Sequence, residues 1–193
     1  MKRIVLTGGP GAGKTVVAAH IAAERSDRFA LVPEAATQVY TQLRTRWDRL
    51  DVTGRHDVQR RIYRLQREQE DRIAAEQPGK ILLLDRGTID GAAYWPEGAE
   101  AYWQDLGTAH AAELARYDAV IFLQTSAALG LYDGDDSNVC RFEDAEAAIA
   151  SDKLLELLWR DHPRLLKVSA FPELNEKLKR VRDVLDGLRS NSA

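Results

Sequence analysis

The stretch "LTGGPGAGKT", residues 6–15, decides the fold. Gly8, Gly13, Lys14 and Thr15 occupy the fixed positions of the pattern G-x-x-x-x-G-K-[ST]. The preceding "KRIVLT" is a short apolar run rich in β-branched residues, and the following "TVVAAHIAAER" is rich in alanine. These compositions predict a strand before the glycine loop and a helix after it.

A loop of this kind predicts a nucleoside triphosphate as ligand, with Mg²⁺ as its metal. Glycines let backbone N–H groups turn toward phosphate oxygens, and the positive end of the helix dipole points the same way. Lys14 is expected to reach the β- and γ-phosphates, and the Thr15 hydroxyl to hold the metal. The alternative is a glycine turn that only connects strand to helix. The residues expected to bind the nucleotide are Gly8, Gly9, Pro10, Gly11, Ala12, Gly13, Lys14 and Thr15.

Length and composition predict a single domain over residues 1–193, since 193 residues with 45% hydrophobic content suit one sizeable core. The apolar runs at 81–84 and 119–123 are too short to cross a bilayer, and the glycine loop interrupts any signal-peptide core. A cytoplasmic protein without membrane partners is expected. The single cysteine, Cys140, forms no internal disulfide and no cysteine zinc framework.

The net charge of −3 gives no large positive field for nucleic acid. Six arginines fall within residues 55–76, but five acids lie among them, so local charge nearly cancels. This pattern favours a solvated helix face over a nucleic-acid patch. No nucleic-acid partner is expected, and the oligomeric state is left open.

Four more short runs predict strands: "RFALVPEAA", whose strand is expected to end near Pro33 and Glu34, "ILLLDRG", "AVIFLQT" and "LLKVSA". Nearly continuous apolar strands are typical of a parallel sheet covered on both faces. Because the strands alternate with helical segments, we expect an α/β P-loop NTPase fold with a doubly wound, five-stranded parallel sheet and helices on both faces. Ligands of such sheets bind beyond the carboxyl ends of the strands.

Helical spacing of apolar residues predicts a helix over residues 36–50, with Val39, Leu43 and Trp47 four apart. Gly54 is expected to break it, and a long helix is expected to resume at Asp57. The terminal helix is expected over about residues 172–188.

The carboxyl ends of the first three strands bring Glu34, Asp85, Arg86 and Asp90 within reach of one phosphate. Asp85 is expected to bind Mg²⁺ through its water shell opposite Thr15; the alternative is a helix cap. Arg86 is expected to spread its donors over the transferring oxygens; the alternative is a structural ion pair with Glu34 or Asp90.

Glu34 is predicted to face the acceptor hydroxyl as its base or anchor. Glu34 and Asp85 both follow strands expected to flank the glycine loop, so both carboxylates can point into the crevice beyond the sheet. Close like charges are expected to raise one of the two pKa values toward the range useful for a base. The alternative is that Glu34 only begins a helix, where the dipole favours an acid.

The blocks "RIVLTGGPGAGKT", "VPEAAT", "LLLDRGTIDGAAYW", "RYDAVIFL" and "RFEDAEAAIASDKLLELLW" resemble a P-loop ATPase/kinase family. This family is related to the ribosylnicotinamide kinase domain of NadR and, more distantly, to deoxynucleoside kinases. The resemblance implies that Glu34 is base or hydroxyl anchor and that Asp85 and Arg86 organise metal and phosphate. The sequence departs from deoxynucleoside kinases at residues 85–87, Asp-Arg-Gly, where those enzymes generally have a block like Glu-Arg-Ser.

The segment after the third strand, where related kinases build the acceptor pocket, contains Tyr94, Trp95, Tyr102 and Trp103. An aromatic cluster there can stack a base or ring; the alternative is simple core packing. Arg141 is predicted to belong to a mobile lid over the phosphates and to act in catalysis, and the alternative is a pair with Glu143 or Asp144.

The function expected is an ATP- and Mg²⁺-dependent kinase that acts on a small hydroxyl-bearing, nucleoside-like metabolite. After its late strand the chain has "QTSA" instead of the Asn-Lys-x-Asp of GTPases. This favours ATP and leaves GTP possible. The alternative function is a nucleotide-hydrolysing switch or binding module, with water as the acceptor.

Overall fold

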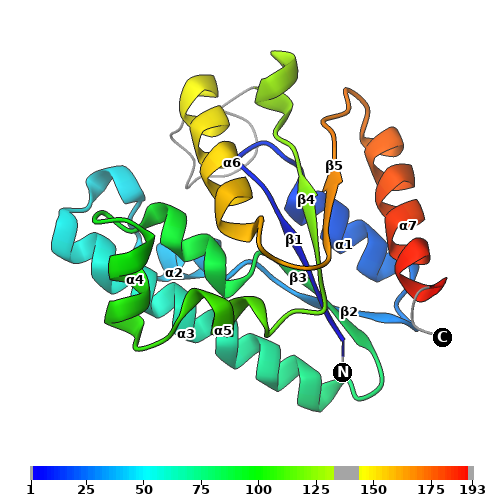
Figure 1. The fold of residues 1–193 in the computed structure, drawn as a ribbon, viewed down its shortest axis with the longest axis horizontal. Helices are drawn as coiled ribbons and strands as arrows, with labels where there is room; N and C mark the ends of the chain where they lie inside the picture. The colour runs from blue at the N-terminus through cyan, green and yellow to red at the C-terminus, as the bar shows by residue number, and fades with distance from the viewer. Residues whose placement is uncertain (1, 133–143, 191–193) are drawn as a thin grey trace.

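A parallel sheet of five strands forms the centre of the protein (Figure 1). The computed structural model describes residues 2–132 and 144–190. The strand order is β2-β3-β1-β4-β5, and every neighbouring pair is parallel. All five predicted strands are confirmed: β1 (Arg3–Thr7), β2 (Phe29–Val32), β3 (Ile81–Asp85), β4 (Ala119–Leu123) and β5 (Leu165–Val168).

The register aligns the carboxyl ends of the strands at one edge. Leu6 of β1 lies opposite Asp85 of β3 and Ile121 of β4, so the glycine loop begins between these two strands. Strand β2 pairs only with β3, with Val32 opposite Leu84. The expectation that both acids follow strands flanking the loop is therefore right for Asp85 and wrong for Glu34, whose strand lies one position further out.

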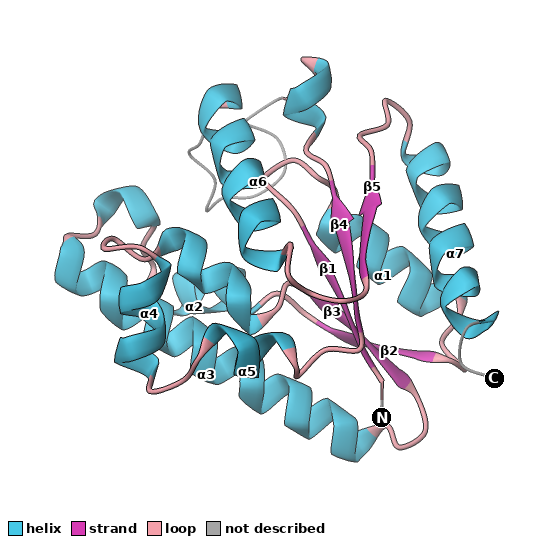
Figure 2. Ribbon diagram, viewed as in Figure 1, coloured by secondary structure: helices cyan, strands magenta, loops and turns pink. Residues whose placement is uncertain are grey.

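Helices cover both faces of the sheet, which confirms the doubly wound fold (Figure 2). Helices α1 and α7 pack on one face, and α3 to α6 pack with a short 3₁₀ helix, η2, on the other. The helices are α1 (Lys14–Glu24), α2 (Ala35–Leu43), η1 (Trp47–Arg49), α3 (Val52–Glu76), η2 (Thr88–Tyr94), α4 (Ala99–Leu106), α5 (His110–Leu114), η3 (Ser126–Leu129), α6 (Ala145–Trp159) and α7 (Leu174–Ser190).

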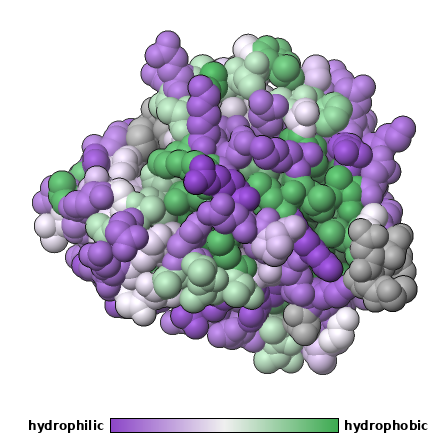
Figure 3. Space-filling model, viewed as in Figure 1, coloured by the Kyte–Doolittle hydropathy of each residue, from purple (hydrophilic) through white to green (hydrophobic). Residues whose placement is uncertain are grey.

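In the space-filling view, hydrophilic residues cover most of the visible face and hydrophobic residues gather near its middle (Figure 3). Within residues 2–132 and 144–190, no helix combines the length and the apolar character that crossing a membrane requires.

The predicted helix over residues 36–50 is wrong in its second half. Helix α2 ends at Leu43 because Arg44 adopts a left-handed conformation with φ of 50°. Its N–H and that of Thr45 bond back to carbonyls of the last turn and close the helix. Trp47 then lies in the 3₁₀ helix η1, not on an extended α2.

The predicted break at Gly54 is also wrong, because α3 begins at Val52 and contains this glycine in its first turn. Asp51 is the N-cap, and its carboxylate accepts the Gly54 N–H at 2.8 Å. A side chain that caps a helix start satisfies N–H groups that have no partner within the helix. The capping aspartate therefore outweighs the low helix propensity of one glycine.

We expect Asp51→Ala to lower the free energy of unfolding by about 1 kcal/mol, because the Gly54 N–H loses its acceptor. Asp51→Asn is the matched control and retains most of the stability, since asparagine caps helices as well as aspartate does. Urea denaturation of both variants measures the difference. Equal stability of Asp51→Ala and Asp51→Asn would contradict the capping role.

Candidate active site

The glycine loop joins β1 to α1 through residues that need left-handed backbone. Gly8, Gly11 and Gly13 have φ values of 136°, 74° and 77°. At Gly8 an added Cβ would lie 2.0 Å from the carbonyl oxygen of Leu123 in the neighbouring strand. Helix α1 begins at Lys14, so its free N–H groups face the loop. The local structure expected from the motif is confirmed.

Lys14 is buried against this loop. Its Nζ donates to the carbonyl oxygens of Gly8 and Gly9, at 2.8 Å each. Burial, followed by the nearby charge of Arg86, lowers the pKa of Lys14 to about 7, while three acids oppose the shift. These acids are Asp85, Glu34 and Asp90. The predicted site residues at the strand ends are thus within electrostatic reach of one lysine.

Asp85 ends β3 as a buried carboxylate. Neither of its oxygens has a hydrogen-bond partner within the described residues. Burial, with the charge of Glu34 as the next cause, raises the pKa of Asp85 to about 6. The Thr15 hydroxyl lies close enough to oppose that rise. An unsatisfied carboxylate beside a hydroxyl supplies oxygen ligands of the type that Mg²⁺ prefers.

Arg86 follows Asp85 with φ of 76°, a left-handed conformation that non-glycine residues rarely adopt. Its Nε donates to Oε1 of Glu34 at 2.6 Å, and a terminal nitrogen donates to Oδ2 of Asp90 at 3.2 Å. Its side chain is 15% exposed. Both ion pairs considered from the sequence are present, so Arg86 bridges β3, α2 and η2.

Glu34 lies at the N-cap position of α2, but its side chain does not cap the helix backbone. Its carboxylate accepts hydrogen bonds from Thr37 Oγ1 and Arg86 Nε. Burial alone raises the pKa of Glu34, but the Arg86 charge and these two hydrogen bonds outweigh burial and hold it at about 2. The expectation that one of the two acids has a raised pKa is confirmed for Asp85, not for Glu34.

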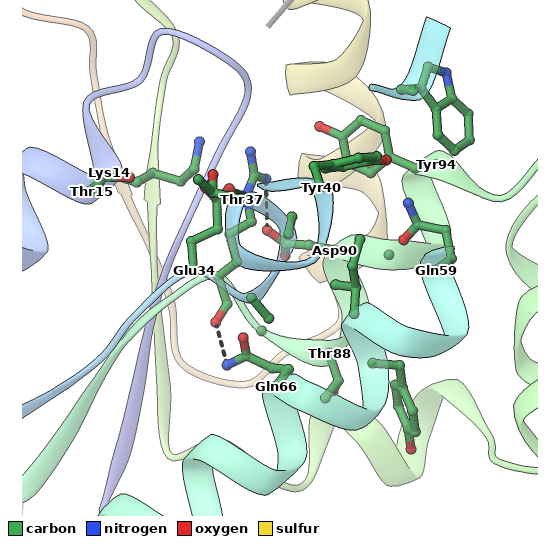
Figure 4. A pocket seen from close by; sticks show the side chains of 18 of the residues that line it. Lys14, Thr15, Glu34, Thr37, Tyr40, Gln59, Gln66, Thr88, Asp90 and Tyr94 are labelled. Atoms are coloured by element: carbon green, nitrogen blue, oxygen red, sulfur yellow. Dashed lines mark hydrogen bonds and ion pairs between the residues drawn. The ribbon is translucent and has the colours of Figure 1, made fainter. Parts of the chain in front are cut away.

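A pocket opens beside this ion pair, between α2, α3 and η2 (Figure 4). Lys14, Thr15, Glu34 and Arg86 line the pocket toward the glycine loop. Aromatic and amide side chains line the rest, among them Tyr40, Trp47, Gln59, Tyr63, Gln66, Tyr94 and Tyr102.

The predicted aromatic cluster divides between pocket and core. Tyr94 and Tyr102 line the pocket, as the ring-stacking interpretation requires, but Tyr102 is 1% exposed and also packs in the hydrophobic core. Trp95 and Trp103 are not among its lining residues; they are 6% and 5% exposed and pack in the hydrophobic core. The core-packing alternative is therefore right for the two tryptophans.

Sequence reasoning missed Gln59 and Gln66, which α3 directs into the pocket. Both are 3% exposed, whereas the charge pattern of residues 55–76 was expected to reflect a solvated helix face. Gln66 Nε2 donates to the carbonyl of Arg86 at 3.3 Å. A signal was present: these glutamines share the helical stripe of Val58 and Ile62, and polar residues within an apolar stripe are directed inward.

Arg141, the predicted lid residue, lies outside the described residues 2–132 and 144–190. In those ranges, no group of three or more histidines, cysteines or acids is arranged to hold a metal ion. The pair formed by Thr15 and Asp85 is smaller than such a cluster, and it requires phosphate oxygens or water to complete a metal shell.

Comparisons with known proteins agree with this architecture. A family model described as an AAA domain matches residues 3–171. Two solved structures of deoxyadenosine kinase from M. mycoides, one with dCMP and dCDP and one with dATP, have TM-scores of 0.66 and 0.63. Both are 14% identical in sequence; the alignments cover 96% of this chain and 99% and 100% of those chains. A comparison with curated proteins gives no match.

The Glu34–Arg86 pair predicts a pH-dependent stability. Since the folded pKa of Glu34, about 2, lies below its ordinary 4.5, its contribution is complete above about pH 5 and is lost as the pH falls toward 2. The shift corresponds to at most about 3 kcal/mol. We therefore expect Glu34→Gln to be less stable than the parent at pH 7, with a difference that shrinks below pH 5.

Urea denaturation at pH 7, 5, 4 and 3 measures this difference. Glu68→Gln, which changes an exposed carboxylate on α3, is the matched control and should differ little from the parent at every pH. A Glu34→Gln difference that stays constant from pH 7 to 3 would show that Arg86 does not hold the carboxylate in its charged form.

Proposed function

The chain belongs to the AAA domain family, and on this premise we propose that it is an ATP- and Mg²⁺-dependent phosphotransferase. Its acceptor is the hydroxyl of a small, nucleoside-like metabolite. One observation carries the proposal: the Glu34–Arg86 pair lies where the glycine loop meets a pocket lined by aromatic and amide side chains. A hydrolase needs room for water alone, whereas this arrangement offers a second, shaped binding site beside the phosphates.

The donor nucleotide is held by the loop from Gly8 to Thr15. Its N–H groups and the start of α1 provide positive potential for the phosphates. The Lys14 ammonium donates to the carbonyl oxygens of the loop in this structure, and it can turn to donate to phosphate oxygens. Negative phosphates beside Lys14 favour its protonated form, which offsets the lowering of its pKa by burial.

Thr15 and Asp85 fit a magnesium ion, because the buried oxygens of Asp85 have no partner among the described residues and lie near the Thr15 hydroxyl. When bound there, the metal neutralises charge on the β- and γ-phosphate oxygens. Asp85 would bind the ion as a carboxylate. The ion would offset the cost of burying this unpaired charge, which provides part of the driving force for binding.

Arg86 and Glu34 act at the point of transfer. Guanidinium has five N–H donors, and two bonds to carboxylates leave capacity for the equatorial oxygens of the phosphoryl group. With a pKa of about 2, Glu34 is a weak base, so its role is to accept a hydrogen bond from the acceptor hydroxyl and orient it. A loose transition state needs little proton abstraction before transfer, which makes orientation the larger contribution.

The acceptor fits the pocket in chemical terms. Tyr40, Tyr94 and Trp47 offer faces and edges to a ring, and the amides of Gln59 and Gln66 can both donate and accept hydrogen bonds. A nucleoside has the complementary groups: a planar heterocycle with hydrogen-bond donors and acceptors, and a hydroxyl on the attached sugar. The sequence resemblance to ribosylnicotinamide and deoxynucleoside kinases supports the same class.

The fate of the γ-phosphoryl group tests the function directly. γ-Labelled ATP is incubated with Mg²⁺, the protein and a panel of nucleosides and related metabolites, and the products are separated. Label in a phosphorylated metabolite supports the kinase. Label only as free phosphate, at a rate no panel member changes, replaces the kinase with a nucleotide-hydrolysing switch.

Saturating Mg-ATP should stabilise the parent protein, because a ligand that binds only the folded state raises stability by mass action. At a concentration 100 times the Kd, the gain is about 2.7 kcal/mol, or roughly 5–10 °C in Tm for a chain of this size. Lys14→Ala should lose most of this shift. Lys153→Ala, on the exposed face of α6, is the control and should keep it.

Differential scanning fluorimetry with Mg-ATP and Mg-GTP gives both values. Nucleotide binding through the glycine loop is wrong if neither nucleotide changes the Tm of the parent, or if Lys14→Ala responds as the parent does.

Glu34→Gln and Asp85→Asn should separate the two acids. We expect Glu34→Gln to bind Mg-ATP within about twofold of the parent and to lower turnover on the order of 10²-fold, because the acceptor hydroxyl loses its charged partner. Asp85→Asn should instead raise the Mg²⁺ concentration needed for half-maximal rate by roughly tenfold, since a carboxylate ligand is lost.

Steady-state rates over a Mg²⁺ titration, with Tm as a control for folding, test both expectations. Glu34→Asp is the second variant, because it keeps the charge and should recover part of the turnover. If Glu34→Gln shifts the Mg²⁺ requirement and leaves turnover at saturation intact, the two roles are reversed.

A further inference from the structure

One face of α6 contacts both loops that the proposed reaction uses. Asp152 and Trp159 are seven residues apart, two helical turns, and therefore lie on the same face. They are 6% and 0% exposed. Asp152 reaches the glycine loop, and Trp159 reaches the segment that carries Arg86. No motif of the sequence assigned either residue a role.

Asp152 bonds directly to the backbone of the glycine loop. Its Oδ1 accepts the Gly9 N–H at 2.7 Å. An added Cβ at Gly9 would lie 2.8 Å from the Cβ of Asp152 and 2.9 Å from the carbonyl of Ala148, so only glycine permits this approach of the helix. Burial raises the pKa of Asp152, and the backbone N–H groups of Gly9 and Thr125 oppose that rise. The carboxylate thus joins α6, the glycine loop and the end of β4.

Trp159 acts on Arg86 through Asp90. Its Nε1 donates to Oδ1 of Asp90 at 2.7 Å. Thr7, directly before the glycine loop, donates to the same carboxylate at 2.9 Å. Asp90 in turn accepts from the Arg86 guanidinium. Two donors from separate elements fix the carboxylate, and its second oxygen then fixes one end of the guanidinium.

The packing around Gly87 points to the same arrangement. Gly87 has an ordinary φ of −120°, so backbone freedom does not explain a glycine here. An added Cβ would lie 2.9 Å from the ring of Trp159 and 3.2 Å from Tyr117. The absence of a side chain after Arg86 therefore makes the room that the indole occupies.

We propose that Asp152 and Trp159 form a positioning element on α6 that sets the glycine loop and Arg86 at a fixed separation for phosphoryl transfer. The inference rests on the proposed function, since Arg86 must act on the phosphate that the loop holds. Transfer is sensitive to displacements of about 1 Å. One helix that bonds to both loops keeps their spacing constant, and neither Asp152 nor Trp159 is among the residues that line the pocket.

The Trp159 arm of the test uses Trp159→Phe, which removes the N–H donor and keeps most of the ring. Trp103→Phe, in the same hydrophobic core but outside the pocket, is the matched control. We expect Trp159→Phe to bind Mg-ATP within twofold of the parent and to slow loss of the γ-phosphoryl group, to acceptor or water, roughly 10- to 100-fold. In a protein that already contains Arg86→Lys, adding Trp159→Phe should not lower the rate of γ-phosphoryl loss any further.

The Asp152 arm uses Asp152→Asn, with Glu146→Gln on the exposed face of α6 as control. We expect affinity for Mg-ATP to fall roughly tenfold in Asp152→Asn and to stay unchanged in the control. In protein labelled with ¹⁵N-glycine, the Gly9 amide proton should move upfield in Asp152→Asn, because it loses a short bond to a carboxylate.

The two arms separate this inference from the kinase proposal. If the label from ATP goes only to water, the kinase proposal fails, but the effect of Trp159→Phe on hydrolysis and both Asp152 readouts still decide the positioning role. The positioning role is overturned if Trp159→Phe slows the reaction no more than Trp103→Phe, or if its loss persists in the Arg86→Lys background. It is also overturned if Asp152→Asn leaves both Mg-ATP affinity and the Gly9 amide unchanged.

Discussion

Arg86 carries a permanent positive charge on a side chain that is only 15% exposed, and such a charge is stable only beside charges of opposite sign. Glu34 and Asp90 supply them from the start of α2 and from η2. Asp90 is four residues from Arg86, but Glu34 is 52 residues away, so the position of α2 beside η2 follows from this shared charge. The pocket lies between α2, α3 and η2, so the requirement to neutralise one arginine also shapes the site.

A second network of buried polar and charged side chains holds the backbone of the segment after Arg86. Glu113 accepts from the Thr88 hydroxyl at 2.6 Å and from Tyr63 at 2.8 Å. Tyr117 accepts the Thr88 N–H at 2.8 Å and donates to Glu70, which also pairs with Arg116. Buried polar groups of this kind are costly unless fully paired, and here the partners come from α3, η2 and α5.

The parts of the structure that local sequence determines were predictable. Short-range sequence pattern predicts the glycine loop and the five strands. It also places Asp85 and Arg86 at the carboxyl edge of the sheet, because a parallel sheet brings its strand ends to one edge. The inward orientation of Gln59 and Gln66 was not predicted, because the many charges of α3 indicate a solvated face and outweigh the weaker signal that these glutamines share the stripe of Val58 and Ile62. The depressed pKa of Glu34 was not predicted either, because the ion pair with Arg86 was considered only as the alternative to a role of Arg86 at the phosphate.

The Asp-Arg-Gly sequence at residues 85–87 shows how one fold supports differently built sites. Deoxynucleoside kinases generally place a serine-like residue at the third position, but here the ring of Trp159 occupies the space of that side chain. Gly87 therefore brings no side-chain hydroxyl to this position, and the indole N–H of Trp159 donates to Asp90, which pairs with Arg86. At 14% identity the likeness to the deoxyadenosine kinase structures shows a shared fold and does not carry over the contacts around the arginine. The identity of the acceptor must then be derived from the pocket's own side chains, Gln59 and Tyr94 among them, and not from the neighbours' ligands.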